Sequence, residues 1–278
     1  MHCQDRIICI QVKREWAEDG ESYFSGLKQR LRFQSTAIRA DIGSVRVAEQ
    51  VKSKQRVADH GEVFTNEREV NAMLDMVKQE TERLDSRFLE PACGDGNFLA
   101  EILRRKLAVV KQRYGKNPRD WEKYAFVAVG SIYGVELLPD NTADCRKRLL
   151  SIVEEARRKA IKADGDQRFM DAIRYVLSRN ILNGDALTML DAKDNPIIFS
   201  EWSLVNGDKV KRRDFRLDEM LEGNVEQNES LSLFGDIADN GDVSPRSEWE
   251  YDEETQAFIP KPITEYPLTS FYEVMNGE

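Results

Sequence analysis

Residues 87–103 join an apolar, strand-like lead to a short glycine turn and a helical run. Phe88 and Leu89 precede Glu90, the turn Cys-Gly-Asp-Gly follows, and residues 98–103 have a helical apolar pattern. Two glycines let the backbone approach a ligand closely, and the start of a helix presents unpaired N–H groups. This order of strand, glycine loop and helix indicates an α/β unit with a ligand site where the strand ends.

Strand-like and helical segments alternate through the middle of the chain. The hydrophobic pattern predicts strands over residues 126–129, 131–137, 181–182 and 196–202. It predicts helices over residues 67–84, 98–114, 141–163 and 167–179. Such alternation favours a doubly wound, mainly parallel sheet that binds ligands at the carboxyl ends of its strands. Few residues follow Trp202, so we expect the C-terminal half of the sheet to be incomplete.

Four segments carry a resemblance to a known family. Glu-Pro-Ala-Cys-Gly-Asp-Gly-Asn-Phe at residues 90–98 resembles motif I of S-adenosylmethionine-dependent methyltransferases, in the form typical of DNA adenine-N6 methyltransferases. Residues 61–65 resemble motif X of that family, with Asn66 in place of the usual proline. Residues 132–137 and 180–187 resemble the second and third strands of the family, each with its acid. The segments follow the family order, and the resemblance implies a Rossmann-like methyltransferase fold.

The resemblance assigns a part of the cofactor to each motif. Glu90 and the loop after it would surround the methionine part and the sulfonium, because a carboxylate suits a cation. Glu136 would accept the ribose hydroxyls, and Asp185 the adenine amino group, with Leu187 beside the ring. The implied cofactor is S-adenosylmethionine, and the residues implied to bind it are Phe64, Thr65, Glu90, Ala92, Gly94, Asp95, Gly96, Asn97, Glu136, Leu137, Asp185 and Ala186.

The two residues of the motif X segment, Phe64 and Thr65, also have a simpler interpretation. Thr65 is a plausible N-cap of the following helix, and Phe64 a core aromatic.

A nicotinamide cofactor would also use a glycine loop and a ribose acid. Its fingerprint, however, needs a third glycine and an acid about 20 residues later. Here Phe98 and Leu99 occupy that region, and the step to Glu136 is much longer.

The second family signature, Asn/Asp-Pro-Pro-Tyr/Phe after the fourth strand, is not present in the sequence. Residues 194–197 come closest, but they precede a predicted strand instead of following one. Residues 200–203 follow the apolar part of that strand, 197–199, and hold our two candidates. Glu201 would accept a hydrogen bond from the amino group of a flipped target base, and Trp202 would stack on the base. The alternative for Trp202 is a buried tryptophan at a strand end.

The resemblance implies a DNA methyltransferase-like protein of the adenine-N6 type, from a restriction-modification or related system. A second subunit would supply the catalytic loop or the recognition of the DNA target. Two alternatives stay open: a non-catalytic S-adenosylmethionine-binding relic or regulatory protein, and a methyltransferase that acts on RNA or protein.

Charge divides the chain into unequal parts. Residues 214–278 hold 17 acidic and 3 basic side chains, whereas the rest has a small positive net charge. A basic body suits phosphates, and an acidic tail repels them. The expected organisation is an N-terminal extension (1–45), a cofactor-binding core (46–213), an acidic disordered linker (214–257) and a C-terminal docking segment (258–278).

A short apolar string lies in the acidic linker. Ser-Leu-Ser-Leu-Phe at residues 230–234 resembles the peptide that binds the bacterial replication sliding clamp, with serine in place of glutamine. Leu231, Leu233 and Phe234 would make that contact. The alternative is a tether that folds back on the body.

The remaining composition restricts the compartment. Four cysteines without a Cys-x-x-Cys pair and only two histidines predict reduced thiols and no metal site. No apolar run approaches the ~18 residues of a membrane span. We therefore expect a cytoplasmic protein of a bacterium or phage, with no membrane partner.

Overall fold

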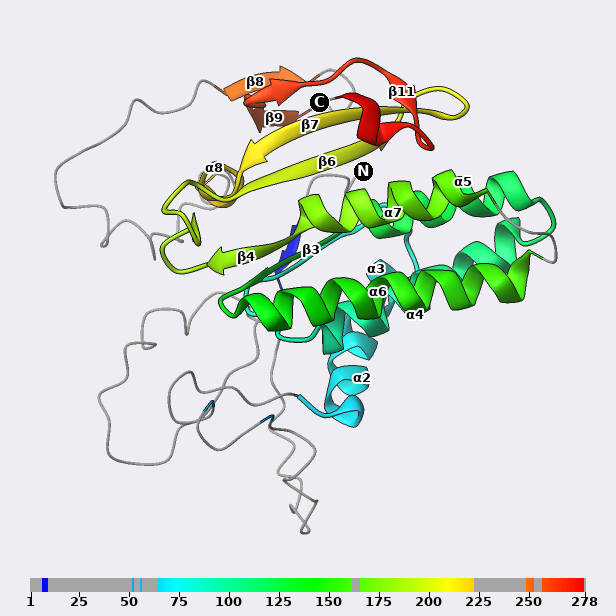
Figure 1. The fold of residues 1–278 in the computed structure, drawn as a ribbon, viewed down its shortest axis with the longest axis horizontal. Helices are drawn as coiled ribbons and strands as arrows, with labels where there is room; N and C mark the ends of the chain where they lie inside the picture. Colours follow the sequence, from blue (N-terminus) through cyan, green and yellow to red (C-terminus); the bar gives the residue numbers. More distant parts are fainter. Residues whose placement is uncertain are drawn as a thin grey trace, which may run out of the picture.

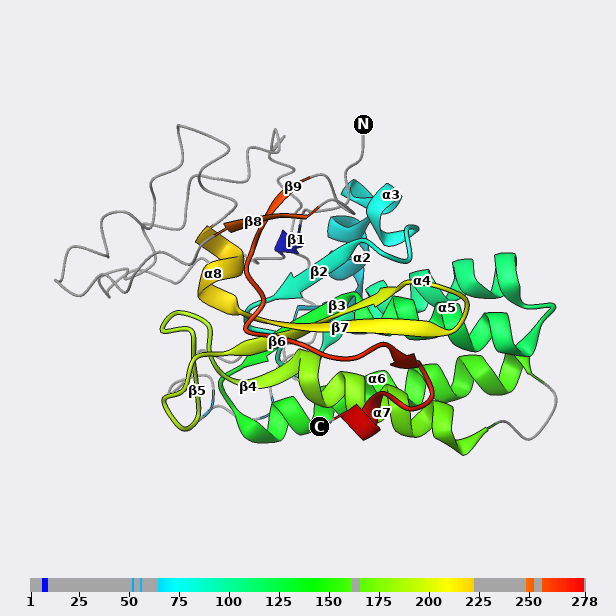
Figure 2. The same ribbon diagram turned by 90° about the horizontal axis from the view of Figure 1, so that it is seen from above.

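The computed structural model describes residues 7–9, 52, 56, 65–161, 166–222, 249–252 and 257–277. These residues form a mixed α/β fold with a mainly parallel sheet and helices, as predicted, and a second, antiparallel sheet (Figures 1 and 2). In chain order the elements are β1 (Ile7–Cys9), α2 (Glu67–Met76), α3 (Lys78–Thr81), β2 (Arg87–Glu90), α4 (Asn97–Tyr114), α5 (Pro118–Gly130), β3 (Ile132–Glu136), α6 (Pro139–Ala160), α7 (Gln167–Asn180), β4 (Ile181–Asp185), β5 (Leu190–Asp191), β6 (Ile198–Leu204), β7 (Lys209–Arg216), α8 (Leu217–Glu222), β8 (Trp249–Asp252), β9 (Ala257–Pro260), β10 (Thr264–Glu265), β11 (Thr269–Ser270) and a 3₁₀ turn (Val274–Gly277).

The strands of the first sheet lie in the order in which the chain makes them. β1, β2, β3 and β4 are neighbours and parallel, and the short β5 adds antiparallel to β4. Connections between parallel strands are right-handed, so successive steps in one direction place the connecting helices on one face. Figure 1 shows α4 and α6 on one side of β3 and β4, and the hairpin of β6 and β7 on the other.

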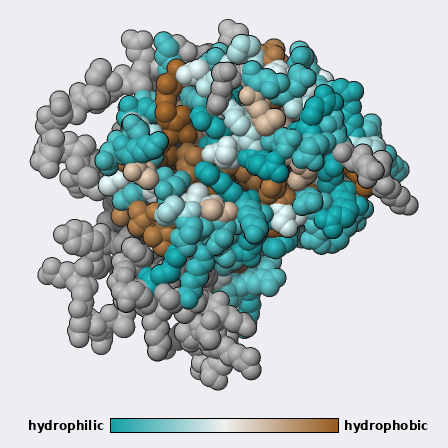
Figure 3. All heavy atoms as spheres, in the orientation of Figure 1, coloured by the Kyte–Doolittle hydropathy of each residue, from teal (hydrophilic) through white to brown (hydrophobic). Residues whose placement is uncertain are grey.

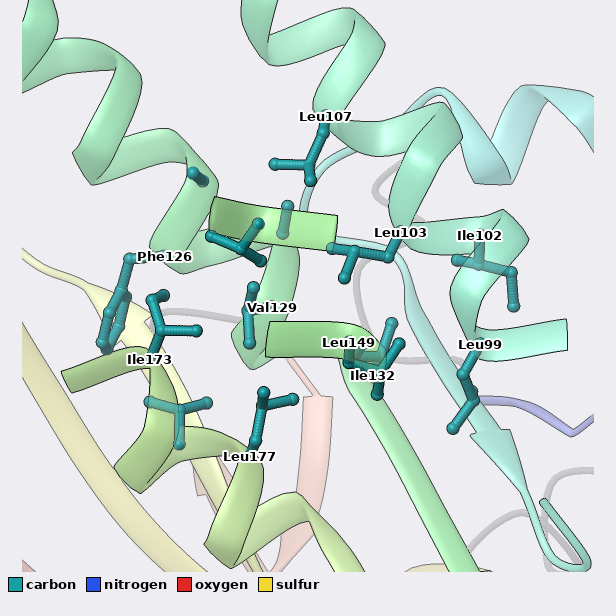
Figure 4. Close-up of a cluster of buried hydrophobic side chains, with 14 of the residues drawn as sticks. Leu99, Ile102, Leu103, Leu107, Phe126, Val129, Ile132, Leu149, Ile173 and Leu177 are labelled. Atoms are coloured by element: carbon teal, nitrogen blue, oxygen red, sulfur yellow. The ribbon is translucent and has the colours of Figure 1, made fainter. Parts of the chain in front are cut away.

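The two faces of the sheet contribute to different hydrophobic clusters. Phe88, Ile132 and Ile181 join the larger cluster with α4 to α7, part of which is drawn in Figure 4. The second cluster joins the opposite face to the hairpin and α8, and contains Leu89, Tyr133, Val135, Ile197, Phe199 and Leu217. Among the described residues, the hairpin thus occupies the place that a doubly wound sheet gives to a second layer of long helices.

Two local predictions were wrong. Asn66, not Thr65, caps α2, because its side chain accepts the N–H of Glu69 at 2.9 Å. Residues 126–129, predicted as a strand, form the last turn of α5, which Asn117 caps and Pro118 begins. Its end lies so close to β6 that a Cβ on Gly130 would be 3.1 Å from that of Trp202.

The second sheet brings the end of the chain back to the body. β7 pairs antiparallel with β6 and also with β10 and β11, which lie in the expected docking segment. Phe271, just after β11, is fully buried. β7 continues to Arg216, past the predicted end of the core at residue 213. Leu231, Leu233 and Phe234, the predicted clamp contacts, lie outside the described residues.

Lys106 of α4 is buried, although lysine side chains are usually exposed. Its Nζ donates to the backbone oxygens of Leu84 and Ser86, at 3.1 and 2.5 Å, and to Oγ of Ser131 at 2.5 Å. The lysine therefore joins the segment before β2 to the residue before β3, at the amino-terminal edge of the sheet.

This burial predicts an unusual pH dependence of stability. Desolvation lowers the pKa of Lys106 from 10.5 to about 7, although its three oxygen acceptors favour the charged form. Between these two values the unfolded chain binds more protons than the folded one, so the free energy of unfolding rises with pH. Relative to a Lys106→Met variant, the wild type should gain up to ~1.4 kcal/mol per pH unit above pH 7. Urea unfolding at several pH values measures this difference, and parallel curves for the two proteins would contradict it.

Candidate functional site

The glycine loop lies at the carboxyl end of β2 and leads directly into α4. Gly94 and Gly96 have φ of 54° and 84°, in the left-handed region that favours glycine. The N–H of Cys93 donates to the oxygen of Val135 at 3.0 Å, which ties the loop to β3. A Cβ on Gly96 would lie 2.6 Å from Sγ of Cys145, so α6 packs directly against the loop.

Glu136, at the end of β3, is buried beside this loop. One carboxylate oxygen accepts the N–H of Gly94 at 2.8 Å, and the other accepts the N–H of Leu138 at 3.0 Å and Nδ2 of Asn141 at 3.3 Å. The predicted ribose acid is thus held against the predicted methionine loop. Asn141, which helps to orient it, was not identified from the sequence.

Glu90 and Asp95 each have a buried oxygen that the described chain leaves without a hydrogen-bond partner. These atoms are Oε2 of Glu90, whose residue is 7 % exposed, and Oδ1 of Asp95. Asp95 also forms an ion pair with Arg148 at 3.2 Å. Buried polar groups are nearly always paired, so such atoms suggest a ligand.

Glu136 and Asp95 lie close enough to Glu90 to disfavour its ionisation. Burial raises the pKa of Glu90 well above its ordinary value, and the neighbouring Cys145, Glu136 and Asp95 raise it further. Burial also raises the pKa of Asp95, although Arg148 opposes this change. A cationic ligand would relieve the repulsion among these groups.

Thr65 and Asn97 join the start of α2 to the start of α4. Asn97 Nδ2 donates to the backbone oxygen of Thr65 at 3.1 Å, and its Oδ1 accepts from Arg148 at 2.6 Å. Thr65 therefore lies beside the glycine loop, as the resemblance implied, with its backbone oxygen making this contact. Phe64 lies outside the described residues.

The ends of β3 and β4 meet at the proposed adenine side. Asn183 Nδ2 donates to the backbone oxygens of Glu136 and Leu137, at 2.8 and 2.9 Å. Asp185 Oδ1 accepts the N–H of Leu187 at 2.8 Å, in the turn that contains Ala186. The Leu137 and Leu187 side chains are 56 % and 65 % exposed. Figure 3 shows exposed hydrophobic residues as separate patches on a mostly hydrophilic surface.

Two basic residues upstream of α2 contact the start of α6. Lys52 Nζ donates to Oδ1 of Asn141 at 2.6 Å and to Asp144 at 2.7 Å, and Arg56 contacts Asp140 at 2.6 Å. Lys52 is therefore linked through Asn141 to Glu136. The sequence analysis missed this contact, although the acids at the start of α6 complement the charges at 52 and 56.

Glu201 and Trp202 do not lie at this site. β6 belongs to the antiparallel sheet, so the premise that they follow a parallel strand is wrong. Glu201 contacts Arg87, the first residue of β2, whereas Glu90 is the last, about 10 Å farther along the strand. Trp202 packs edge-on against Phe126 and is the buried tryptophan of the alternative interpretation.

Within the described residues, no three His, Cys, Asp or Glu side chains are grouped to hold a metal ion. None of the described helices combines the length and apolar character that a bilayer crossing requires. No protein-family model matches the chain, and neither the curated proteins nor the solved structures contain a significant match.

Proposed function

We propose that the protein binds S-adenosylmethionine and is related in function to DNA adenine-N6 methyltransferases. The observation that carries the proposal is the convergence of Glu90, Asp95 and Glu136 on a glycine loop at the carboxyl ends of β2 and β3. Two of these acids have buried oxygens without a partner in the described chain. A sulfonium, an α-amino group and a ribose diol are ligands that such a site suits.

The chain's own residues fit the three parts of this cofactor. Glu90 and the loop 91–96 would hold the methionine part, with the glycines leaving room for it. Glu136 would exchange part of its contact with Gly94 for the ribose hydroxyls, while Asn141 keeps it oriented. Leu137 and Leu187 offer exposed apolar surface for the adenine ring, with Asp185 beside it. The bound cofactor would supply a methyl group on a sulfonium, which an acceptor attacks.

The proposal includes a partner for methyl transfer to DNA. In the described chain, Glu201 pairs with Arg87 at the start of β2 and Trp202 packs against Phe126 of α5, so neither lies at the glycine loop. A second subunit would then contribute the residues that grip the flipped base and recognise the target. The proposed fold is a Rossmann-like methyltransferase fold in which the β6–β7 hairpin covers the second face of the sheet.

Binding of the cofactor is tested with Glu136→Ala. We expect wild-type protein to bind S-adenosylmethionine, and the variant to bind it more weakly by about 1.5–3 kcal/mol, the loss of a charge-assisted hydrogen-bonding group. Isothermal titration calorimetry measures both affinities. Glu155→Ala, which removes a carboxylate from the exposed side of α6, is the matched control and should bind normally. Absence of binding to the wild type at millimolar ligand would overturn the proposal.

A transfer assay separates the proposed function from its alternatives. Tritiated methyl transfer to DNA should be slow with the purified chain and faster with proteins that co-purify with it. Transfer to RNA or protein would favour a different acceptor. Cofactor binding without transfer to any of these would favour a regulatory or relic protein.

A further inference from the structure

Glu90 is the most enclosed acid of the candidate site. It is 7 % exposed, and no described group donates to its Oε2. A buried carboxylate with one oxygen that receives no hydrogen bond is costly when ionised, and a proton removes most of that cost.

The groups that act most strongly on Glu90 come from α6, β3, the glycine loop and α4. These are Glu136 on β3, Asp95 in the loop and Cys145 on α6, which all disfavour a negative charge on Glu90. The N–H of Leu99 on α4 acts in the opposite direction. The two cations that act on the neighbouring Asp95 are Arg148 and Lys52, which form ion pairs with Asp95 and Asp144.

We propose that Glu90 carries a proton when no ligand is bound and releases it when a sulfonium binds, so that Glu90 distinguishes S-adenosylmethionine from its uncharged thioether product. This inference rests on the proposed function. The proton passes from the Glu90 carboxyl to the buffer, and the carboxylate left behind faces the positive sulfur. S-adenosylhomocysteine has no such charge and leaves Glu90 protonated.

Calorimetry in two buffers of very different ionisation enthalpy tests the proposal. Both ligands are titrated into the full chain at several pH values above the ordinary range of a glutamate carboxyl. The difference in observed enthalpy between the two buffers gives the number of protons released on binding. This number should be about one higher for S-adenosylmethionine than for S-adenosylhomocysteine. The product shares the amino and carboxyl groups of the cofactor, so the comparison isolates the sulfonium.

Two variants assign the proton to Glu90. Glu90→Gln should bind S-adenosylhomocysteine with nearly wild-type affinity, bind S-adenosylmethionine at least tenfold more weakly, and lose the extra proton release. Asp95→Asn, which changes a neighbouring acid in the same way, should keep that release. Thermal unfolding checks that both variants fold, and the wild-type comparison stays decisive if Glu90→Gln does not.

The possible outcomes separate the two proposals. Failure of both ligands to bind would overturn the proposed function. Binding of both with equal proton release would overturn only the role of Glu90, and loss of the release in Asp95→Asn alone would move that role to Asp95.

Discussion

Replacing Glu201 with alanine is expected to lower the free energy of unfolding by about 3–5 kcal/mol, the usual cost of breaking a buried ion pair. Its carboxylate contacts Arg87 at 2.5 Å and Arg213 at 3.1 and 3.2 Å, and it is almost completely buried. Burial alone would raise the pKa of Glu201, but the two arginines hold it below its ordinary value. Removal of the carboxylate leaves both arginines without this counter-charge, which urea unfolding would detect.

The same variant distinguishes a structural from a catalytic role. The affinity of folded Glu201→Ala for S-adenosylmethionine should equal that of the wild type, because Glu201 lies at the opposite end of β2 from the glycine loop. Glu155→Ala removes an exposed ion pair and should cost less than about 1 kcal/mol. A variant of unchanged stability that has lost methyl transfer would instead support the catalytic assignment.

Gly96→Ala is expected to destabilise the protein by about 3 kcal/mol or more, through strain and steric overlap together. The backbone has φ of 84°, and the new Cβ would lie 2.6 Å from Sγ of Cys145. Gly207 is a matched control, because its φ is also positive, at 58°, but no atom lies within 4 Å of its Cβ position. Gly207→Ala should therefore cost only about 1–2 kcal/mol, the strain of the left-handed region.

A double-mutant cycle tests the cause of the Gly96 effect. Cys145→Ala removes the sulfur that the new methyl group would meet, so the double variant should be less destabilised than the sum of the single variants, by about 0.5–3 kcal/mol. Simple additivity would show that backbone strain alone explains the loss.

The parts of the fold that the sequence predicted are those with a distinctive local pattern. The glycine loop, the strands that end in Glu136 and Asp185, and the helices α4, α6 and α7 all lie close to their predicted positions. Residues 126–129 were misassigned because a short apolar run suits a buried strand or a buried helix equally well. The cap of α2 was misplaced by one residue because Thr65 and Asn66 are both good N-caps.

Tertiary contacts account for the other errors. Lys106 lies three residues after Leu103 and four before Val110, on the apolar stripe of α4, so its position signalled burial although its charge suggested exposure. In β7, Arg212 and Asp214 pair with each other in the interior, although charged side chains are usually exposed. Pairing between distant residues, such as Arg213 with Glu201, cannot be derived from local pattern.

The sequential order of β1 to β4 has a consequence for synthesis of the chain on the ribosome. The parallel strands are complete once residue 185 has emerged, but the buried residues that the described chain packs on Leu89, Tyr133 and Val135 come later, at Ile197, Phe199 and Leu217. Until then the nascent sheet has one apolar face without its native cover. This interval is when the growing chain is most open to aggregation and most in need of a chaperone.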